Sequence, residues 1–217
     1  MAVTFENKIY SRTGVIVFLK VADNFGGLSN MAGGYPLQVD GTLCLTSEAL
    51  YQACRFPHLP DVQRLILDQR SPMAAKMKSK HFRNDSRTDW ETVKTDVMEW
   101  CLSAKLACNW DRFSALLSST QDKQIVEESR RDNFWGAIPR NTDELVGYNV
   151  LGQLLMDLRD SIQQSTSYPP SQITPLSIPN FMLLGERIRR VEALKERSDS
   201  DREGRALLRQ MKLFPEG

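Results

Sequence analysis

The sequence predicts an α+β fold, built as one helix-rich domain with a small sheet. Three observations lead to this prediction. A β-branched apolar run occupies residues 15–19, an apolar stripe with helical spacing occupies residues 90–108, and strand and helix patterns mix without regular alternation. The 217 residues are 41% hydrophobic and 25% charged, an ordinary globular composition that excludes a wholly disordered or fibrous chain.

The first part of the chain predicts two short strands and one helix, at residues 15–19, 43–45 and 48–56. Glycine pairs between the two strands indicate a turn-rich connection. Thr46 or Ser47 offers a cap for the helix, because a hydroxyl at this position accepts a bond from an exposed backbone amide. Pro57 and Pro60 then end the helix.

The middle of the chain predicts further helices and one strand. They are a helix that begins at Ser71-Pro72 and carries residues 76–80, the longest helix with Asp89 as its cap, helices at 112–118 and 149–163, and a strand at 124–127. No internal repeat is visible.

The chain is expected to divide into a domain at 1–160, a linker at 161–185 and a charged helix or tail at 186–217. The stretch 161–185 is uncharged and long enough to span a membrane, but it contains four prolines and many Ser, Thr and Gln residues. A linker is therefore expected rather than a span.

Neither secretion nor a metal site is expected. The N-terminal residues lack the basic and then apolar pattern of a secretory signal, so a cytoplasmic location is expected. The four cysteines form no C-x-x-C pair, and only His58 and His81 could assist them, so we expect buried thiols. With no metal cluster and no histidine base, any catalysis should depend on carboxylates, on a lysine, or on both.

Residues 70–87 form a locally basic stretch in a chain whose net charge is only +1. It contains Arg70, Lys76, Lys78, Lys80, Arg83 and Arg87 against the single acid Asp85. Such a stretch could bind a diphosphate or a nucleic-acid backbone, and it could equally be a solvated helix face.

Glu48 is the first candidate for chemistry, because partial burial in the first turn of an apolar helix could tune its pKa for acid or base work. The alternative is that it only complements the helix dipole.

The second candidate is the run 125–136, in which acidic residues precede Phe134, Trp135 and Gly136. An aromatic wall beside a carboxylate suits a sugar with an oxocarbenium-like transition state, although a surface turn with buried aromatic rings is an alternative.

Polar residues near glycines form a third group. Ser29, Asn30 and Asn149 could bond ribose hydroxyls or phosphate oxygens, and they could equally be turn and cap residues.

Five short motifs together resemble the NADAR family, also called YbiA-like, over about residues 15–160. They are Phe25-Gly26-Gly27-Leu28-Ser29-Asn30, residues 46–53, Asp89-Trp90, Asp132-Asn133-Phe134-Trp135-Gly136, and Asn149-Val150-Leu151-Gly152. The resemblance implies a mixed α/β N-glycosidase that binds ADP-ribose-like ligands and cleaves a ribose C1–N bond without a metal or cofactor.

The family resemblance implies one of two activities. One hydrolyses ribosylamino intermediates of the riboflavin pathway, and the other removes ADP-ribose from guanine in DNA as the antidote to a DNA ADP-ribosylating toxin. The chain looks more like the toxin-associated branch, so ADP-ribosylated guanine in DNA is the expected substrate. The toxin would be a functional partner without implied contact. A module that binds ADP-ribose without cleaving it is the remaining alternative.

The resemblance assigns roles residue by residue. It implies that Glu48, Trp90, Asp132 and Trp135 are functional, with Ser29, Asn30, Phe134, Gly136, Asn149 and Gly152 in the binding motifs. Two positions depart from the family pattern: Ala49 stands where many relatives carry His, and Arg55, also expected to bind substrate, where many carry Lys. Glu48 or Asp132 would assist loss of the base and activate water. Alternatively, the opened ribose would form an imine with Lys76 or Lys105.

Overall fold

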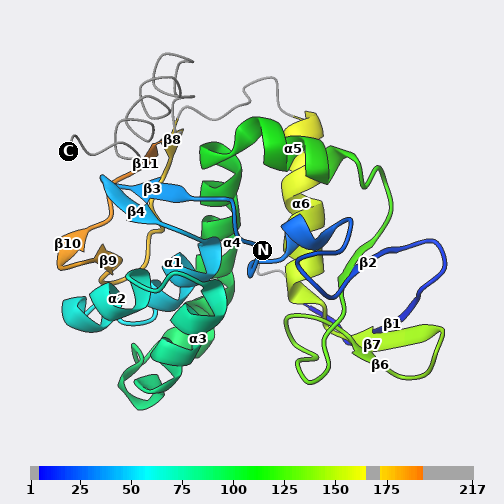
Figure 1. The fold of residues 1–217 in the computed structure, drawn as a ribbon, viewed down its shortest axis with the longest axis horizontal. Coiled ribbons are helices and arrows are strands. Elements are labelled where there is room, and N and C mark those ends of the chain that lie inside the picture. The colour runs from blue at the N-terminus through cyan, green and yellow to red at the C-terminus, as the bar shows by residue number, and fades with distance from the viewer. Residues whose placement is uncertain (1–4, 165–171, 193–217) are drawn as a thin grey trace, which may run out of the picture.

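The computed structural model describes residues 5–164 and 172–192 of the chain, and helices form its framework (Figure 1). The α-helices are α1 (Ser47–Cys54), α2 (Pro60–Leu67), α3 (Pro72–Lys80), α4 (Trp90–Cys108), α5 (Trp110–Ser118) and α6 (Val150–Gln164). Helices α4 and α6 pack together in the centre, with α1, α2 and α3 on the outer side of α4. Small sheets complete the fold, so the predicted α+β class is confirmed.

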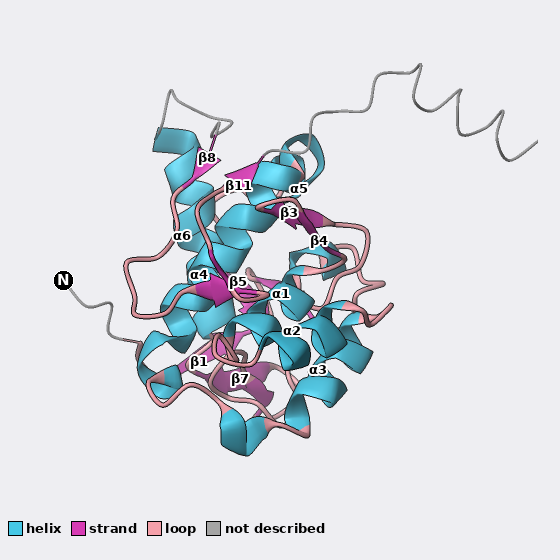
Figure 2. Ribbon diagram, turned by 90° about the vertical axis from the view of Figure 1, so that its left-hand side faces the viewer, coloured by secondary structure: helices cyan, strands magenta, loops and turns pink. Residues whose placement is uncertain are grey.

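The strands are short and form several separate sheets. An antiparallel sheet has the order β1 (Lys8–Ser11), β7 (Glu144–Gly147), β6 (Ile138–Pro139), and a second has the order β4 (Thr42–Cys44), β3 (Leu37–Val39), β11 (Val191–Glu192), β8 (Gln172–Ile173). Strands β2 (Ile16–Phe18) and β5 (Ile125–Glu127) pair in parallel, and β9 (Met182–Leu183) pairs with β10 (Glu186–Arg187). Figure 2 shows the sheets of β1 and β3 at opposite ends of the molecule.

The predicted helix starts are largely confirmed. The Thr46 side chain accepts a bond from the Ala49 amide at 3.2 Å, and the Ser71 side chain accepts one from the Ala74 amide at 3.1 Å. Asp89 does occupy the cap position of α4, but its side chain makes no capping bond. Both its carboxylate oxygens instead accept bonds from Arg87, at 2.6 and 2.9 Å.

Helix α2 is missing from the sequence prediction, because Pro60 was interpreted only as the end of the preceding helix. Proline is also favoured in the first turn of a helix, where its missing N–H costs nothing, and Pro60 is the first residue of α2. The strands β1, β3, β6 and β7 were missed because runs of two to four residues carry too little alternation to be recognised.

The core lies between α4 and the elements on both its sides. The inward face of α4 includes Val97, Cys101 and Ala104, which are fully buried. All four cysteines are buried thiols, as expected. None of the described helices is both long enough and apolar enough to cross a membrane.

Residues 172–192, here called the C-terminal strand segment, pack on the outer side of α1, α2 and α4. The segment covers the second half of the expected linker and the start of the expected tail. Phe181, Leu183, Ile188 and Val191 are buried in the main core, because this short apolar set removes enough surface from water to order the segment. The division at residue 160 stays a prediction, and most of the expected tail lies outside the described residues.

Polar contacts also hold the C-terminal strand segment. The Trp100 indole donates to the Thr174 carbonyl at 3.0 Å. The Gln63 amide nitrogen donates to the carbonyls of Ala53 and Met182, at 3.0 and 2.9 Å. Because the Arg87 guanidinium also donates to the Pro179 carbonyl at 2.6 Å, the segment is joined to several parts of the domain.

Candidate active site

Glu48 lies at the centre of a buried hydrogen-bond network in the first turn of α1, with 4% of its surface exposed. One carboxylate oxygen accepts a bond from the Asn30 amide at 2.7 Å, and the other accepts one from the Gln52 amide at 2.9 Å. A buried carboxylate is costly unless its oxygens are bonded. Both partners here are neutral amides, so the charge is fixed in place without being neutralised.

The partners of Glu48 are themselves held by neighbouring elements. The Ser47 hydroxyl donates to the Asn30 backbone carbonyl at 3.2 Å, and the buried Ser79 hydroxyl of α3 donates to the Gln52 side-chain oxygen. The Asn30 side-chain oxygen is buried and has no partner among the described residues. A buried unpaired acceptor is uncommon, which makes this oxygen a candidate for a ligand contact.

Glu127, at the end of β5, belongs to the same cluster of charges. Burial raises its pKa to about 7. The nearby Lys76 ammonium opposes this, whereas the carboxylates of Asp132 and Glu48 add to it. Glu127 therefore retains a proton at pH values where an exposed glutamate has lost it.

Sequence reasoning missed Glu127, although the run 125–136 was recognised. It named Asp132 and the aromatic residues, which stand out by type. The available signal was the position of Glu127 at the carboxyl end of an apolar strand, where ligands often bind in folds with parallel strands.

Asp132 shapes the turn that follows β5. It is exposed, and one carboxylate oxygen accepts bonds from the backbone amides of Phe134 and Trp135, at 3.0 and 2.9 Å. Gly136 then passes so close to β5 that a Cβ atom there would lie 2.5 Å from the Glu127 carbonyl. Both residues thus define the path of the turn beside Glu127.

The aromatic residues form one continuous cluster through Tyr51. The Tyr51 ring lies 5.1 Å from the Trp90 ring and 5.8 Å from the Trp135 ring, and Phe134 lies 5.1 Å from Trp135. Trp90 is buried and Trp135 is partly exposed. The residues expected to be functional include Trp90 and Trp135 but not Tyr51, which lies three residues after Glu48 on α1 and contacts both indole rings.

Arg55 provides positive charge next to this cluster. Its guanidinium lies 5.2 Å from the centre of the Trp90 ring, and its Nε donates to the Ser86 hydroxyl at 2.6 Å. Burial lowers the pKa of Arg55, and the positive charge of Arg83 lowers it further. Two guanidinium groups that repel one another in this way form a favourable place for an anion.

The two candidate lysines have different surroundings. Lys76 is exposed on α3 and lies within electrostatic reach of Glu127. Lys105 is fully buried, and its ammonium donates to the carbonyls of Gly27 and Ser29, at 2.7 and 3.0 Å. Lys105 therefore supports the 27–29 loop from beneath, and Lys76 is the more exposed of the two amines. The imine-forming role of Lys105 stays a prediction.

Asn149 and Gly152 were expected to contact ligand, and the structure gives them a different task. The buried Asn149 side chain accepts a bond from the Glu127 amide at 3.0 Å and donates to the Ile125 carbonyl at 2.8 Å. A Cβ atom at Gly152 would lie 2.2 Å from the same carbonyl. Both residues thus join α6 to β5 and hold the strand end that carries Glu127.

Ser29 and Asn30 lie in the loop on the other side of the site from β5 and its Glu127. The Ser29 side chain is buried, accepts a bond from the Met31 amide at 3.1 Å and also interacts with Glu127. The structure thus brings together Glu48, Asn30, Ser29, Lys76 and Asp132 from the sequence prediction, and it adds Glu127, Tyr51 and Gln52.

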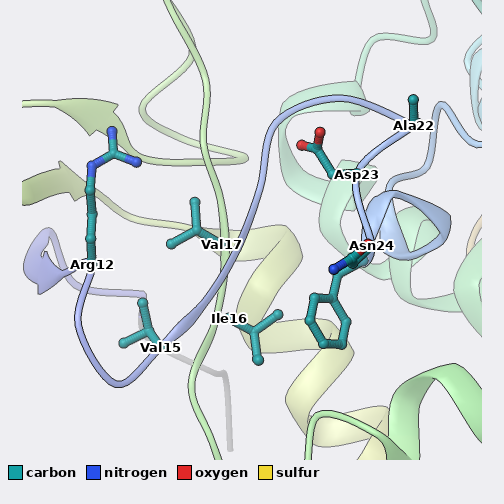
Figure 3. Close-up of a pocket in the computed structure, with 8 residues that line it drawn as sticks. Arg12, Val15, Ile16, Val17, Ala22, Asp23 and Asn24 are labelled. Atoms are coloured by element: carbon teal, nitrogen blue, oxygen red, sulfur yellow. The ribbon is translucent and has the colours of Figure 1, made fainter.

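A groove with a volume of about 600 Å³ lies elsewhere on the molecule. Figure 3 shows Arg12 and Asp23 on its two sides, with Val15, Ile16 and Val17 of the β2 region between them. None of the expected site residues lines it. Within residues 5–164 and 172–192, no group of three or more His, Cys, Asp or Glu side chains is placed to hold a metal ion.

Comparison with known proteins gives three informative similarities. The NADAR domain matches residues 17–163. N-glycosidase YbiA of Escherichia coli (strain K12) is 33% identical over 151 residues, covering 68% of this chain and 88% of that protein. The riboflavin biosynthesis protein PYRR of Zea mays is 34% identical over 164 residues, covering 69% of this chain but 25% of that protein.

A solved structure is similar as well. The NMR structure of E. coli YbiA has a TM-score of 0.60 and 32% identity to this chain, and the match covers 70% of this chain and 90% of that one. The C-terminal strand segment lies beyond the NADAR match.

Proposed function

This chain belongs to the NADAR family, and we propose that its N-glycosidase activity removes ADP-ribose from guanine bases in DNA. It would thereby reverse the modification made by a DNA ADP-ribosylating toxin. Family membership supports a hydrolase of N-glycosyl bonds. The proposal adds the substrate and the role as an antitoxin.

One observation carries the catalytic part of the proposal: two glutamates of the site have opposite environments. Both oxygens of Glu48 accept amide bonds, so this carboxyl group acts as an acceptor on both sides. Burial raises the pKa of Glu127 to about 7, which suits a carboxylic acid that donates a proton. Such a division between two carboxyl groups is the pattern that assigns acid and base roles in glycoside hydrolysis.

The mechanism follows from these two environments. Positive charge develops at the anomeric carbon as the base leaves, and the fixed charge of Glu48 stabilises it. Glu127 protonates the departing base, and Glu48 or Asp132 accepts a proton from the attacking water. The unpaired Asn30 oxygen accepts a hydrogen bond from a ribose hydroxyl.

The remainder of ADP-ribose has a place beside these carboxylates. The guanidinium groups of Arg55 and Arg83 bind the diphosphate, and the aromatic cluster of Trp90, Tyr51 and Trp135 packs against a sugar or base ring. The exposed lysines of α3 start with Lys76, which lies next to this site. Their positive charge supports a polyanionic substrate such as DNA over a small neutral one.

An imine route through Lys76 is the alternative chemistry. Lys76 is the candidate amine that is both exposed and close to Glu127. Borohydride reduction during turnover would leave a stable adduct on Lys76 if the opened ribose forms an imine there. Absence of an adduct supports direct hydrolysis by water.

A second substrate is favoured by the names of two relatives, PYRR of Zea mays and riboflavin biosynthesis protein VVA0006 of Vibrio vulnificus. This substrate would be a ribosylaminopyrimidine of the riboflavin pathway. If the histidine and lysine expected in many relatives at the positions of Ala49 and Arg55 are required for the riboflavin-type reaction, the substrate of this chain differs from theirs.

One assay separates these functions. The purified protein is incubated with ADP-ribosylated DNA and, separately, with a ribosylaminopyrimidine, and free ADP-ribose and free ribose are measured. We expect release of ADP-ribose from DNA. Release of ribose alone would favour the riboflavin-type reaction, and tight binding of ADP-ribose without release from either substrate would indicate a binding module.

A further inference from the structure

Helix α3 exposes a stripe of alternating methionine and lysine side chains. Met73, Lys76, Met77 and Lys80 are all exposed, Met73 by 58% and Met77 by 48%. Their spacing of three, one and three residues places them on one face of the helix. Ala75 and Ser79 are buried on the opposite face, so α3 is packed on one side only.

This stripe, here called the Met-Lys stripe, runs past the proposed site. Lys76 is its member within reach of Glu127, and Arg83 follows shortly after the end of α3. A molecule bound along the stripe would therefore have one part beside the site carboxylates and another part outside the site. This matches a chain-like substrate of which only one unit reacts.

The chemistry of the Met-Lys stripe favours a particular chain. Ammonium groups attract phosphates, whereas thioether side chains are flexible and apolar and can contact the faces of unstacked bases. In a duplex those faces are covered by stacking, so exposed methionines would gain little there. An unpaired strand presents both phosphates and base faces, and proteins that bind such strands combine positive charge with aromatic side chains on which the bases stack. On α3 the methionines would take the place of those aromatic side chains.

We infer that the Met-Lys stripe of α3 binds the single-stranded DNA that flanks the modified guanine. This inference rests on the proposed function and adds the surface and the strand state to it. A membrane could in principle also bind a basic and apolar surface, and the test below includes that outcome.

The first experiment measures binding by fluorescence anisotropy, with an unmodified single-stranded oligonucleotide, its duplex and vesicles of anionic phospholipid as probes. The double variant M73S/M77S should bind the single strand about tenfold more weakly than the unsubstituted protein, because the base contacts are lost. The variant K80Q should reduce the slope of log affinity against log salt by about 0.7, the value for one phosphate contact on a single strand.

The matched controls lie away from α3. The variants L43S and K123Q remove an exposed apolar side chain and an exposed positive charge, and they should bind the oligonucleotide as the unsubstituted protein does. Equal affinity for duplex and single strand, undiminished binding by M73S/M77S, or stronger binding to the vesicles than to DNA would each overturn the inference.

The second experiment separates this inference from the proposed function. ADP-ribose release is compared between a modified guanine in an oligonucleotide and the same modified guanosine alone. For M73S/M77S, the ratio of kcat/KM on the oligonucleotide to that on the nucleoside should fall about tenfold, because the flanking contacts exist only for the longer substrate. An unchanged ratio overturns the inference, whereas no release from either substrate by the unsubstituted protein overturns the proposed function, with the anisotropy result still standing.

Discussion

The two walls of the candidate site differ in how they hold their carboxylates. The wall of loop 29–30 and α1 is buried, and both oxygens of Glu48 are bonded to side chains from other parts of that wall. The wall of β5 and turn 129–136 is more open, and Asp132 on it bonds the backbone of its own turn. Acidic residues from the two walls therefore differ in their bonding: side-chain amides bond Glu48, and the backbone of its own turn bonds Asp132.

Glu127 connects the two walls. It lies at the end of β5 on the open wall, yet it interacts with Ser29 and Glu48 of the buried wall. Under the proposed mechanism, the reaction would take place at the junction between the walls, where a proton donor from one side would meet a carboxylate from the other. The following predictions test this division.

The largest effect is expected for Glu48→Gln. The amide nearly preserves the shape but removes the charge that stabilises the transition state, so kcat should fall by about 1,000-fold while the Kd for ADP-ribose changes little. Turnover kinetics and calorimetric titration measure the two quantities. The exposed Glu6, which pairs with Lys8, provides the control variant E6Q. Near-normal turnover by E48Q would remove Glu48 from the reaction.

A loss of about 100-fold is expected for Glu127→Gln at pH 6, because general acid catalysis contributes about this much. In the unsubstituted protein kcat should fall as the pH rises through about 7, since Glu127 then loses the proton it donates. The variant should lack this alkaline decrease. A decrease of the same size in both proteins would assign it to another group.

Lys105 supports the buried wall, and its effect should appear in stability. Burial lowers its pKa to about 7, so between pH 7 and the pKa of the unfolded lysine, about 10.4, the unfolded chain binds a proton that the folded protein does not. The free energy of unfolding should therefore rise with pH above 7, by up to about 1.4 kcal/mol per pH unit. Denaturant unfolding of the unsubstituted protein and Lys105→Met, at pH 7 and 9, measures this rise. Its persistence in the variant would contradict the assignment.

The smallest effect is expected for Asp132→Asn. The asparagine oxygen can accept the same two backbone bonds, so the turn should persist and kcat/KM should fall less than tenfold. Asp132→Ala, which removes those bonds, should lose more. If D132N were as damaging as E48Q, Asp132 would contribute a charge to catalysis and the contrast between the walls would be lost.

The sequence predicted the fold class and the helix starts at Thr46 and Ser71 well, because both depend on local patterns. The Thr46 and Ser71 hydroxyls accept the expected capping bonds, and Glu48 lies close to Asn30. What was missed depends on contacts between distant segments. Asn149 resembles a ligand-binding amide in sequence, but its partners are Ile125 and Glu127, more than twenty residues away.

Burial explains the remaining differences. Lys76 and Lys105 are the same residue type on two helices, and only tertiary packing shows that one is exposed and the other enclosed. Residues 172–192 have the composition of a linker, but a few apolar side chains such as Phe181 suffice to order them once α4 offers a surface. Local composition does not report such a surface.

The C-terminal strand segment has a consequence for how relatives of this protein should diverge. Homologues whose chains stop where the NADAR match ends must cover the outer surface of α4 with other side chains or leave it exposed to solvent. The positions equivalent to Gln63, Arg87 and Trp100, which bond the segment here, should therefore covary with its presence across the family, independently of which glycoside each member hydrolyses.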